Sequence, residues 1–290
     1  MPGADGPYPL PSDAEEAARL ETQYLLLKFC FDGQFTFAPV NLVDGDKVLD
    51  CGCGSGVSLH AFTRLRLKGL WTLDLARSFA SSTGVSFTGI DINPSMFPTD
   101  IPPSVSFDVH SVLSLPSSWT SRFTLINQRF LIGGLTVFQW PVALRELYRV
   151  LKPGGWVQLM ESSMGCEPEE DGVERTRAER LICALLTKRG CLVSDRFATI
   201  ESMLSDAGFR DIRVVEKVYS DVQWTAEQRE ANRALFLSVM RGIEPAVLRE
   251  GLESEEGYEQ LMHETQRDKN LGMTGGIGKV IVFCAQKLDV

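Results

Sequence analysis

The sequence predicts an α/β fold in which a doubly wound, mostly parallel seven-stranded sheet is covered by helices on both faces. Short apolar runs alternate with helical segments from residue 47 to residue 160, and this alternation is typical of parallel strands joined by crossover helices. Glycine and proline turns separate the segments. Two further strand-like runs, at 212–218 and 278–287, bring the number of expected strands to seven.

An amino-terminal helical extension precedes this sheet. The first 12 residues are rich in proline and glycine and predict a loose tail. A helix is expected from Asp13 until Asp32-Gly33, because apolar residues recur there at helical spacing, at Leu20, Tyr24, Leu27 and Phe31. We therefore expect a tail and helical lid at 1–40 and one larger domain at 41–290.

The remaining elements follow in order. Strands are expected at 47–50, 85–92, 104–109, 123–127, 156–160, 212–218 and 278–287. Helices are expected at 57–79, 140–151, 195–207 and 227–250, and the last belongs to a helical insertion at about 222–270. The segment Lys152-Pro153-Gly154-Gly155 is expected to stop the helix and turn the chain into the next strand.

The composition excludes several classes of protein. The chain has 290 residues, of which 44% are hydrophobic and 23% charged, so it can form a sizeable core. Its net charge of −9 disfavours a nucleic-acid partner, since phosphate binding requires a basic surface. No stretch approaches the length of a membrane span, and acids near the start disfavour an export signal.

The cysteines and histidines predict neither a disulfide framework nor a metal site. Seven cysteines show no paired spacing, which favours reduced thiols and a cytosolic, cytoplasmic location. Three histidines without a C-x-x-C pair make a structural zinc site improbable, and no metal is expected.

The strongest motif is Val48-Leu49-Asp50-Cys51-Gly52-Cys53-Gly54-Ser55-Gly56. A strand enters a turn with three glycines, and a helix is expected after it. Glycines permit a sharp bend and the close approach of a ligand, and the helix start favours an anionic group. The spacing G-x-G-x-G differs from the G-x-G-x-x-G of dinucleotide folds. A tight turn without any ligand is the alternative.

At this motif the sequence resembles the class I S-adenosylmethionine-dependent methyltransferase family, whose first motif is close to D/E-x-G-x-G-x-G. Asp50, Gly52, Gly54 and Gly56 match that motif position by position. The resemblance implies the class I methyltransferase fold, with S-adenosyl-L-methionine as cofactor and its methionine part held by this turn. Cys53 lies within the turn and is expected to contact the same ligand.

A second motif, Phe87-Thr88-Gly89-Ile90-Asp91-Ile92-Asn93, ends the next strand. A carboxylate there can accept two hydrogen bonds from a ribose diol. Asp91 matches the ribose-binding acid of the family, which implies that Ile92 and Asn93 lie beside the adenine. The alternative role for Asp91 is a helix N-cap.

The third strand is followed by His110-Ser111-Val112. The family often has an acid near Ser111 that binds the adenine amine, so this chain departs from the pattern there. Ser111 can still form a hydrogen bond, and Val112 can offer a backbone N–H to the base. His110 is a candidate general base because histidine titrates near neutral pH, and a structural role is the alternative.

The fourth strand ends in Asn127-Gln128-Arg129. In the family this strand end faces both cofactor and acceptor. The Asn/Asp-Pro-Pro-Tyr motif that positions amine nucleophiles in many relatives is absent. Asn127 and Gln128 are therefore weak catalytic candidates, with Asn127 also expected at the cofactor, and the alternative for both is bonding to neighbouring loops. Arg129 is expected to pair with an acid.

The segment Arg149-Val150-Leu151-Lys152-Pro153-Gly154-Gly155 matches the R-V-L-K-P-G-G segment of the family. Together with 29–39, it resembles fungal secondary-metabolism methyltransferases. The resemblance covers residues 40 to 165 and implies in-line transfer of a methyl group to a small, apolar metabolite, as O- or N-methylation. Aromatic and apolar residues expected to line the acceptor pocket are Tyr24, Phe31, Phe35, Phe37, Phe130, Trp140, Trp224, Phe236 and Met240.

Two other classes of function stay open at this point. One is a protein that binds S-adenosylmethionine without methyl transfer, acting as a regulator or as a cyclase of the pericyclase kind. The other is a protein methyltransferase, which needs an open groove for its acceptor. A homodimer is also open, and the sequence identifies neither the acceptor nor a catalytic base.

Overall fold

The computed structural model describes residues 10, 14–34, 36–54, 70–79, 84–98, 100–162, 176–193, 196–218, 224–267 and 279–289. Several sequence-based expectations lie partly or wholly outside the described residues. These include the tail at 1–12, of which only residue 10 is described, the site residue Gly56 with the first part of the helix expected at 57–79, and Phe35.

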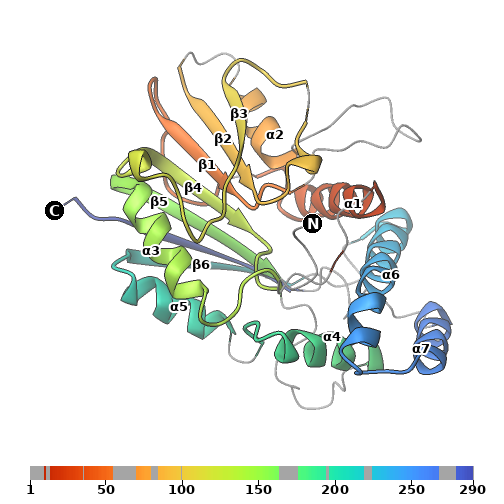
Figure 1. Ribbon diagram of the computed structural model, residues 1–290. Coiled ribbons are helices and arrows are strands. Elements are labelled where there is room, and N and C mark those ends of the chain that lie inside the picture. The colour runs from red at the N-terminus through yellow and green to blue at the C-terminus, as the bar shows by residue number, and fades with distance from the viewer. Residues whose placement is uncertain are drawn as a thin grey trace.

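A seven-stranded sheet forms the centre of the molecule, with the strand order β3-β2-β1-β4-β5-β7-β6 (Figure 1). The strands are β1 Lys47–Cys51, β2 Ser86–Asp91, β3 Val105–Val109, β4 Phe123–Arg129, β5 Leu151–Ser162, β6 Arg210–Val218 and β7 Lys279–Gln286. Only β7 runs against its neighbours β5 and β6. The predicted doubly wound, mostly parallel sheet is thereby confirmed.

The order in which strands are added changes direction at β1. Strands β2 and β3 extend the sheet on one side of β1, and β4 pairs with its other side. In parallel α/β sheets such a switch point leaves a crevice outside the carboxyl ends of the strands. The carboxyl ends of β1, β2 and β4 are therefore where this fold would place a ligand.

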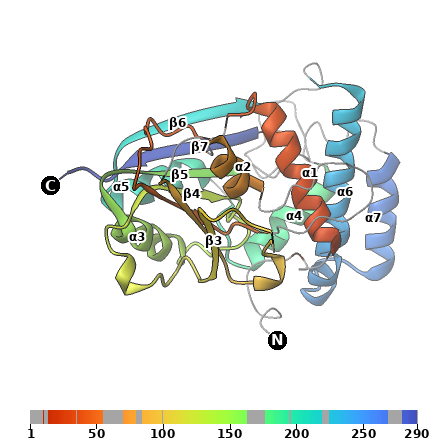
Figure 2. The same cartoon turned by 90° about the horizontal axis from the view of Figure 1, so that it is seen from above.

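Two of the described helices pack on each face of the sheet (Figures 1 and 2). Helices α1 (Ala14–Cys30) and α2 (Leu70–Ser78) pack on one face, in a cluster with Trp71, Leu73 and Tyr24. Helices α3 (Trp140–Val150) and α5 (Arg196–Asp206) pack on the other face. These apolar faces explain why the strands read as nearly continuous hydrophobic runs.

A third apolar cluster lies away from the sheet and is made by α4 (Arg177–Lys188), α6 (Ala226–Arg249) and α7 (Glu255–Arg267). Figure 2 shows α1 beside α6, with α7 outside them. Helices α4 and α6 each begin with a capping box, at Thr176 with Glu179 and at Thr225 with Gln228. Helices α6 and α7 lie within the interval in which the helical insertion is expected. The two remaining short helices are η1 (Pro94–Met96) and η2 (Ser117–Trp119).

The turn expected at 152–155 is wrong. Helix α3 ends at Val150, and β5 begins at Leu151, so Pro153 and Gly154 lie inside the strand. The register between β4 and β5 shifts between Phe123 and Leu125. This irregularity accommodates Pro153, which has no backbone N–H to donate to the neighbouring strand. In this irregular part of β5, the carbonyl of Gly154 accepts a hydrogen bond from the side-chain amide of Gln286 at 3.0 Å.

Most of the described aromatic and apolar residues expected in an acceptor pocket are buried, with exposures of 0–6% for Tyr24, Phe31, Trp140, Trp224, Phe236 and Met240, and their role as pocket lining stays a prediction. One further expectation needs correction. Cys183 is disulfide-bonded, so the expectation of reduced thiols is wrong at that position. Free thiols are present at Cys30, Cys51, Cys53, Cys191 and Cys284, all buried.

Within the described ranges, none of the helices combines the length and the apolar character that crossing a bilayer requires. The same part of the chain contains no group of three or more His, Cys, Asp or Glu side chains arranged to hold a metal ion.

Helix α3 provides a test of the packing that supports the site. Leu147 is fully buried between α3 and the sheet, whereas Val142 on the same helix is 37% exposed. We expect Leu147→Ala to lower the free energy of unfolding by about 2–5 kcal/mol, because it leaves a cavity in the core. Val142→Ala, the control, should change it by less than about 0.5 kcal/mol in the same urea titration. Equal effects would contradict the assigned packing.

Candidate active site

The carboxyl ends of β2, β1 and β4 bring most of the expected site residues together. Asp91 ends β2, the glycine turn follows Cys51 of β1, and Arg129 ends β4. Hydrogen bonds between the neighbouring strands fix this order, since Cys51 lies opposite Ile90 on one side and opposite Gln128 on the other.

The glycine turn has the left-handed backbone that its sequence predicts. Gly52 and Gly54 have φ angles of +62° and +65°, a region that side chains disfavour. A methyl carbon on Gly52 would lie 2.8 Å from Cδ2 of Leu131, and one on Gly54 would lie 3.5 Å from Cδ1 of Leu20. The positive φ favours glycine at position 52, and a side chain there would also displace Leu131, while the more open Gly54 lies next to Leu20 of α1.

Cys53 is 8% exposed, and its backbone N–H donates to the carbonyl of Ile90 at 3.0 Å. Burial, together with the nearby carboxylates of Asp50 and Asp91, raises the pKa of the Cys53 thiol well above its ordinary range. The Cys53 thiol is therefore neutral, and a nucleophilic thiolate is not favoured there. The backbone of Cys53 joins the turn to β2 through its hydrogen bond.

Asp91 is directed at the glycine turn. Its Oδ2 accepts the backbone N–H of Gly54 at 3.0 Å, and its Oδ1 accepts that of Asn93 at 3.0 Å. Burial raises the pKa of the Asp91 carboxyl, and these N–H donors act in the opposite direction. Since a carboxylate has about four acceptor sites, the Asp91 carboxylate can still accept a hydrogen bond from a ligand.

The N-cap alternative for Asp91 is resolved by its neighbour. Asn93 is the N-cap of η1, and its side chain accepts the backbone N–H of Ser95 at 3.0 Å. Beside it, Ile92 is 68% exposed, and Val109 at the end of β3 is 52% exposed. An exposed apolar side chain thus lies directly next to the oriented carboxylate of Asp91.

His110 packs against an aromatic residue. Its ring meets that of Trp119 edge to face, with 5.2 Å between the centroids. The backbone N–H of His110 donates to the carbonyl of Asp91 at 3.1 Å, which joins the end of β3 to the site. This contact accounts for a structural role, and the role as general base stays a prediction.

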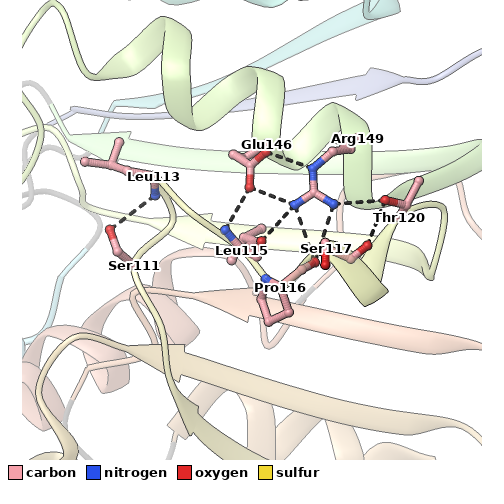
Figure 3. A network of polar contacts seen from close by, with 8 residues as sticks. All are labelled: Ser111, Leu113, Leu115, Pro116, Ser117, Thr120, Glu146 and Arg149. Carbon is pink, nitrogen blue, oxygen red and sulfur yellow. Dashed lines mark hydrogen bonds and ion pairs between the residues drawn. The ribbon is translucent and has the colours of Figure 1, made fainter.

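The loop after β3 contains Ser111 and Val112, and α3 holds it in place (Figure 3). The carboxylate of Glu146 accepts the backbone N–H of Leu115 at 2.7 Å. Arg149 donates to Glu146 at 2.7 and 2.8 Å and to the carbonyl of Leu115 at 3.0 Å. This pair on α3, called here the loop clamp, fixes the segment that begins at Ser111.

Within that segment, the Ser111 hydroxyl accepts the backbone N–H of Leu113 at 3.2 Å, and Val112 is 7% exposed. Both residues therefore stabilise the loop itself, and their contacts with an adenine stay predictions.

Asp50 belongs to a buried polar row that crosses three strands. Asp50 of β1 lies opposite Asn127 of β4, which lies opposite Gln158 of β5. The Asn127 amide donates to Asp50 at 2.8 Å, and the Gln158 amide donates to Asn127 at 3.0 Å. All three side chains are at most 1% exposed. The row is consequently a satisfied network inside the sheet.

Both ends of the row reach other elements. The Thr72 hydroxyl of α2 donates to Asp50 at 2.6 Å. At the other end, the Gln158 side-chain oxygen accepts the backbone N–H of Phe37 at 2.7 Å. Burial raises the pKa of the Asp50 carboxyl, while Arg129, Thr72 and Asn127 favour its charged form. The expected contacts of Asp50 and Asn127 with a cofactor stay predictions, since the row uses their side chains.

Gln128 points to the opposite face of the sheet from Asn127, because neighbouring residues of a strand alternate. It is fully buried, and neither of its amide atoms has a hydrogen-bond partner among the described residues. Full burial separates Gln128 and Asn127 from any acceptor at the surface, so their catalytic roles stay predictions.

The turn after β4 is held by a carboxylate that the sequence analysis missed. Phe130 has a φ of +54°, an uncommon backbone for a residue with a side chain. The fully buried Glu161 of β5 accepts the backbone N–H groups of Leu131 and Ile132 at 3.0 and 3.1 Å. These hydrogen bonds hold Leu131 so that its side chain packs against Gly52. The packing joins the turn after β4 to the turn after β1.

Helix α1 is anchored over the same edge. The Tyr24 hydroxyl and the Lys28 ammonium both donate to Oδ2 of Asp74 on α2, each at 2.9 Å. Tyr24 also lies under the Arg129 guanidinium, 5.5 Å from its ring centroid. Helix α1 is therefore fixed to α2 and lies next to the glycine turn, where Leu20 approaches Gly54, and its role as a lid stays a prediction.

Five residues of this framework were missed by the sequence analysis: Thr72, Glu146, Arg149, Gln158 and Glu161. A polar residue inside an apolar strand, such as Gln158 or Glu161, is the signal that could have identified two of them. No sequence pattern indicates which partner each one has.

The comparisons with known proteins agree with this geometry. A family model described as a methyltransferase domain matches residues 22–214. Among curated relatives, the N-methyltransferase sirN of Leptosphaeria maculans is 33% identical over 56% of this chain and 52% of its own length. The N-methyltransferase gliN of Aspergillus fumigatus is 30% identical over 57% and 53%. The chain spans about half the length of these relatives.

Solved structures show a similar fold at low identity. The [4+2]-cyclase SpnF matches with a TM-score of 0.52 and 18% identity, over 98% of this chain and 99% of that chain. Phosphoethanolamine N-methyltransferase 2 of Haemonchus contortus matches with a TM-score of 0.50 and 18% identity, over 93% and 58%. These similarities support the α/β architecture.

The loop clamp predicts a pH-dependent contribution to stability. Hydrogen bonding to Arg149 lowers the pKa of Glu146 below its ordinary 4.5. The native state thus favours the ionised form, so this contribution is present above the unfolded pKa and is lost as the pH falls through the folded pKa. We expect Glu146→Gln to cost about 1 kcal/mol of unfolding free energy at neutral pH and almost nothing at about pH 3.

The measurement is urea unfolding of wild type and variant at both pH values. Glu201→Gln, at an exposed position of α5, is the control and should give no difference at either pH. A cost for Glu146→Gln that is equally large in acid would show that the charge of Glu146 does not hold the loop.

Proposed function

This chain belongs to the methyltransferase domain family, and we propose that it transfers a methyl group from S-adenosylmethionine to a small, apolar metabolite. The observation that carries the proposal is the contact between Asp91 and the glycine turn. The carboxylate is oriented by the N–H of Gly54 at 3.0 Å and still has acceptor sites to offer.

The residues at this edge fit S-adenosylmethionine. The Asp91 carboxylate lies at the end of β2 beside the glycine turn, and a carboxylate there suits the hydroxyls of a ribose as a hydrogen-bond acceptor. The exposed Ile92 next to it offers an apolar surface to an adenine. Gly54, without a side chain and at a φ of +65°, allows close approach of the amino-acid part of the cofactor.

When bound, S-adenosylmethionine supplies a methyl group activated by a sulfonium. The protein then has to align the acceptor with that methyl group and exclude water. Helix α1 is fixed through Tyr24 and Lys28 to Asp74, and its Leu20 lies next to Gly54, so the helix is placed to limit the access of water to the turn. Glu161 and the loop clamp hold the loops after β4 and β3, and rigid loops keep the reacting groups in register.

The acceptor is proposed from charge and from the relatives. A net charge of −9 disfavours a nucleic-acid acceptor. The relatives sirN and gliN are named N-methyltransferases, which favours nitrogen over oxygen as the methylated atom. A cytosolic location, the absence of a nucleic-acid partner and the open homodimer stay predictions.

The transfer itself is tested by mass spectrometry. The chain is incubated with S-adenosylmethionine carrying a labelled methyl group and with a fungal metabolite extract. One compound that gains a labelled methyl supports the proposal and identifies the acceptor. Label in proteins alone would favour a protein methyltransferase, and tight cofactor binding with no labelled product would favour a function without methyl transfer.

Asp91 gives a prediction about binding. We expect Asp91→Ala to weaken the binding of S-adenosylhomocysteine by about 1–3 kcal/mol, because hydrogen bonds to a charged group are lost. Asp108→Ala, at an exposed position on the adjacent strand β3, is the control and should leave the affinity unchanged. Isothermal titration calorimetry measures both. An Asp91 variant with wild-type affinity would refute the assigned ribose contact.

A further inference from the structure

Arg129 is a cation at the edge of the sheet where the cofactor is proposed to bind. It is the last residue of β4, and its side chain is half-buried. The side chain lies on the same face of the sheet as Asn127, two residues earlier, and therefore on the face of Asp50. The buried polar row thus lies behind the guanidinium, and Tyr24 of α1 lies against it.

No carboxylate of a described residue forms an ion pair with Arg129. Its Nε is buried and has no hydrogen-bond partner in the described part of the chain. In contrast, Arg19, Arg149 and Arg177 each contact a glutamate at 2.6–2.7 Å. The expectation that Arg129 pairs with an acid is therefore wrong within the described residues.

Asp50 does not fill that role. It contributes an electrostatic attraction to Arg129, but its oxygens bond to Thr72 and Asn127, and none of the ion pairs among the described residues joins it to Arg129. The guanidinium has several N–H donors in one plane. Two of them can bind the two oxygens of a carboxylate at once, which an acceptor group with one oxygen does not allow. Since a half-buried charge without an anionic partner is costly, the arrangement favours an anion supplied by a ligand.

From these observations we infer that Arg129 binds the carboxylate of the amino-acid part of the cofactor, an inference that rests on the proposed function. The order of the strands supports it. Asp91 ends β2, the glycine turn follows β1, and Arg129 ends β4, so they follow one another along one edge. Two strand spacings amount to about 10 Å. An extended S-adenosylmethionine spans this distance, with its ribose at Asp91 and its carboxylate at Arg129.

Two ligands and two forms of the protein provide the test. S-adenosylmethionine and its decarboxylated analogue share the adenosyl group, the sulfonium and the amine, and differ in the carboxylate. Calorimetry measures the affinity of both ligands for wild type and for Arg129→Met. Wild type should prefer the ligand with the carboxylate by about ten- to hundredfold. Arg129→Met should reduce this preference to about threefold or less, with the affinity for the analogue almost unchanged.

Arg122→Met is the matched control. Arg122 precedes the other end of β4, has a buried Nε without a partner among the described residues, and lies over the ring of Trp119 at 5.3 Å. It should keep the wild-type preference. Arg129→Lys should keep only part of it, because an ammonium provides the charge without the planar pair of donors.

The outcomes separate this inference from the proposed function. If wild type binds both ligands equally well, Arg129 does not hold the carboxylate, although the cofactor site stands. The same conclusion follows if Arg129→Met keeps the full preference, as it would if Arg129 served an anionic acceptor instead. If wild type binds neither ligand, the proposed function itself fails. Equal affinity of both proteins for the analogue shows that the variant is folded.

Discussion

The row of side chains formed by Thr72, Asp50, Asn127 and Gln158 is the interaction on which the rest of the site depends. It crosses β1, β4 and β5 inside the sheet and ends at the backbone N–H of Phe37. A buried polar group is costly unless its partners are present, so this row tolerates only one register of the three strands. That register fixes the relative positions of the glycine turn and of the end of β4.

Two glutamates apply the same principle to the loops that follow the strands. Glu161 reaches from β5 to the N–H groups of Leu131 and Ile132, and Glu146 reaches from α3 to that of Leu115. In both cases a carboxylate replaces the missing backbone partners of a loop. These hydrogen bonds restrain the loops, as a site that positions a methyl group for transfer requires.

Charge is distributed unevenly at the carboxyl edge of the sheet. The whole chain carries a net charge of −9, yet Arg129 stands at this edge without an acid of its own among the described residues. Asp91 ends β2 and Arg129 ends β4, with the glycine turn after β1 between them. A ligand with hydroxyls at one end and a carboxylate at the other complements this arrangement, and a purely apolar ligand does not.

The sequence alone determined the alternation of strands and helices, the glycine turn and the acid at the end of β2, because these depend on short-range patterns. Backbone bends require glycine, and a carboxylate at a strand end is visible in a few residues. It also indicated that Asn127 and Arg129 end a strand. Their partners were not visible, since Gln158 and Tyr24 are distant in sequence. Only the tertiary structure decided that Asn127 belongs to a buried row and that Arg129 faces the site without an acid, because hydrogen bonds between strands join residues whose separation along the chain carries no pattern.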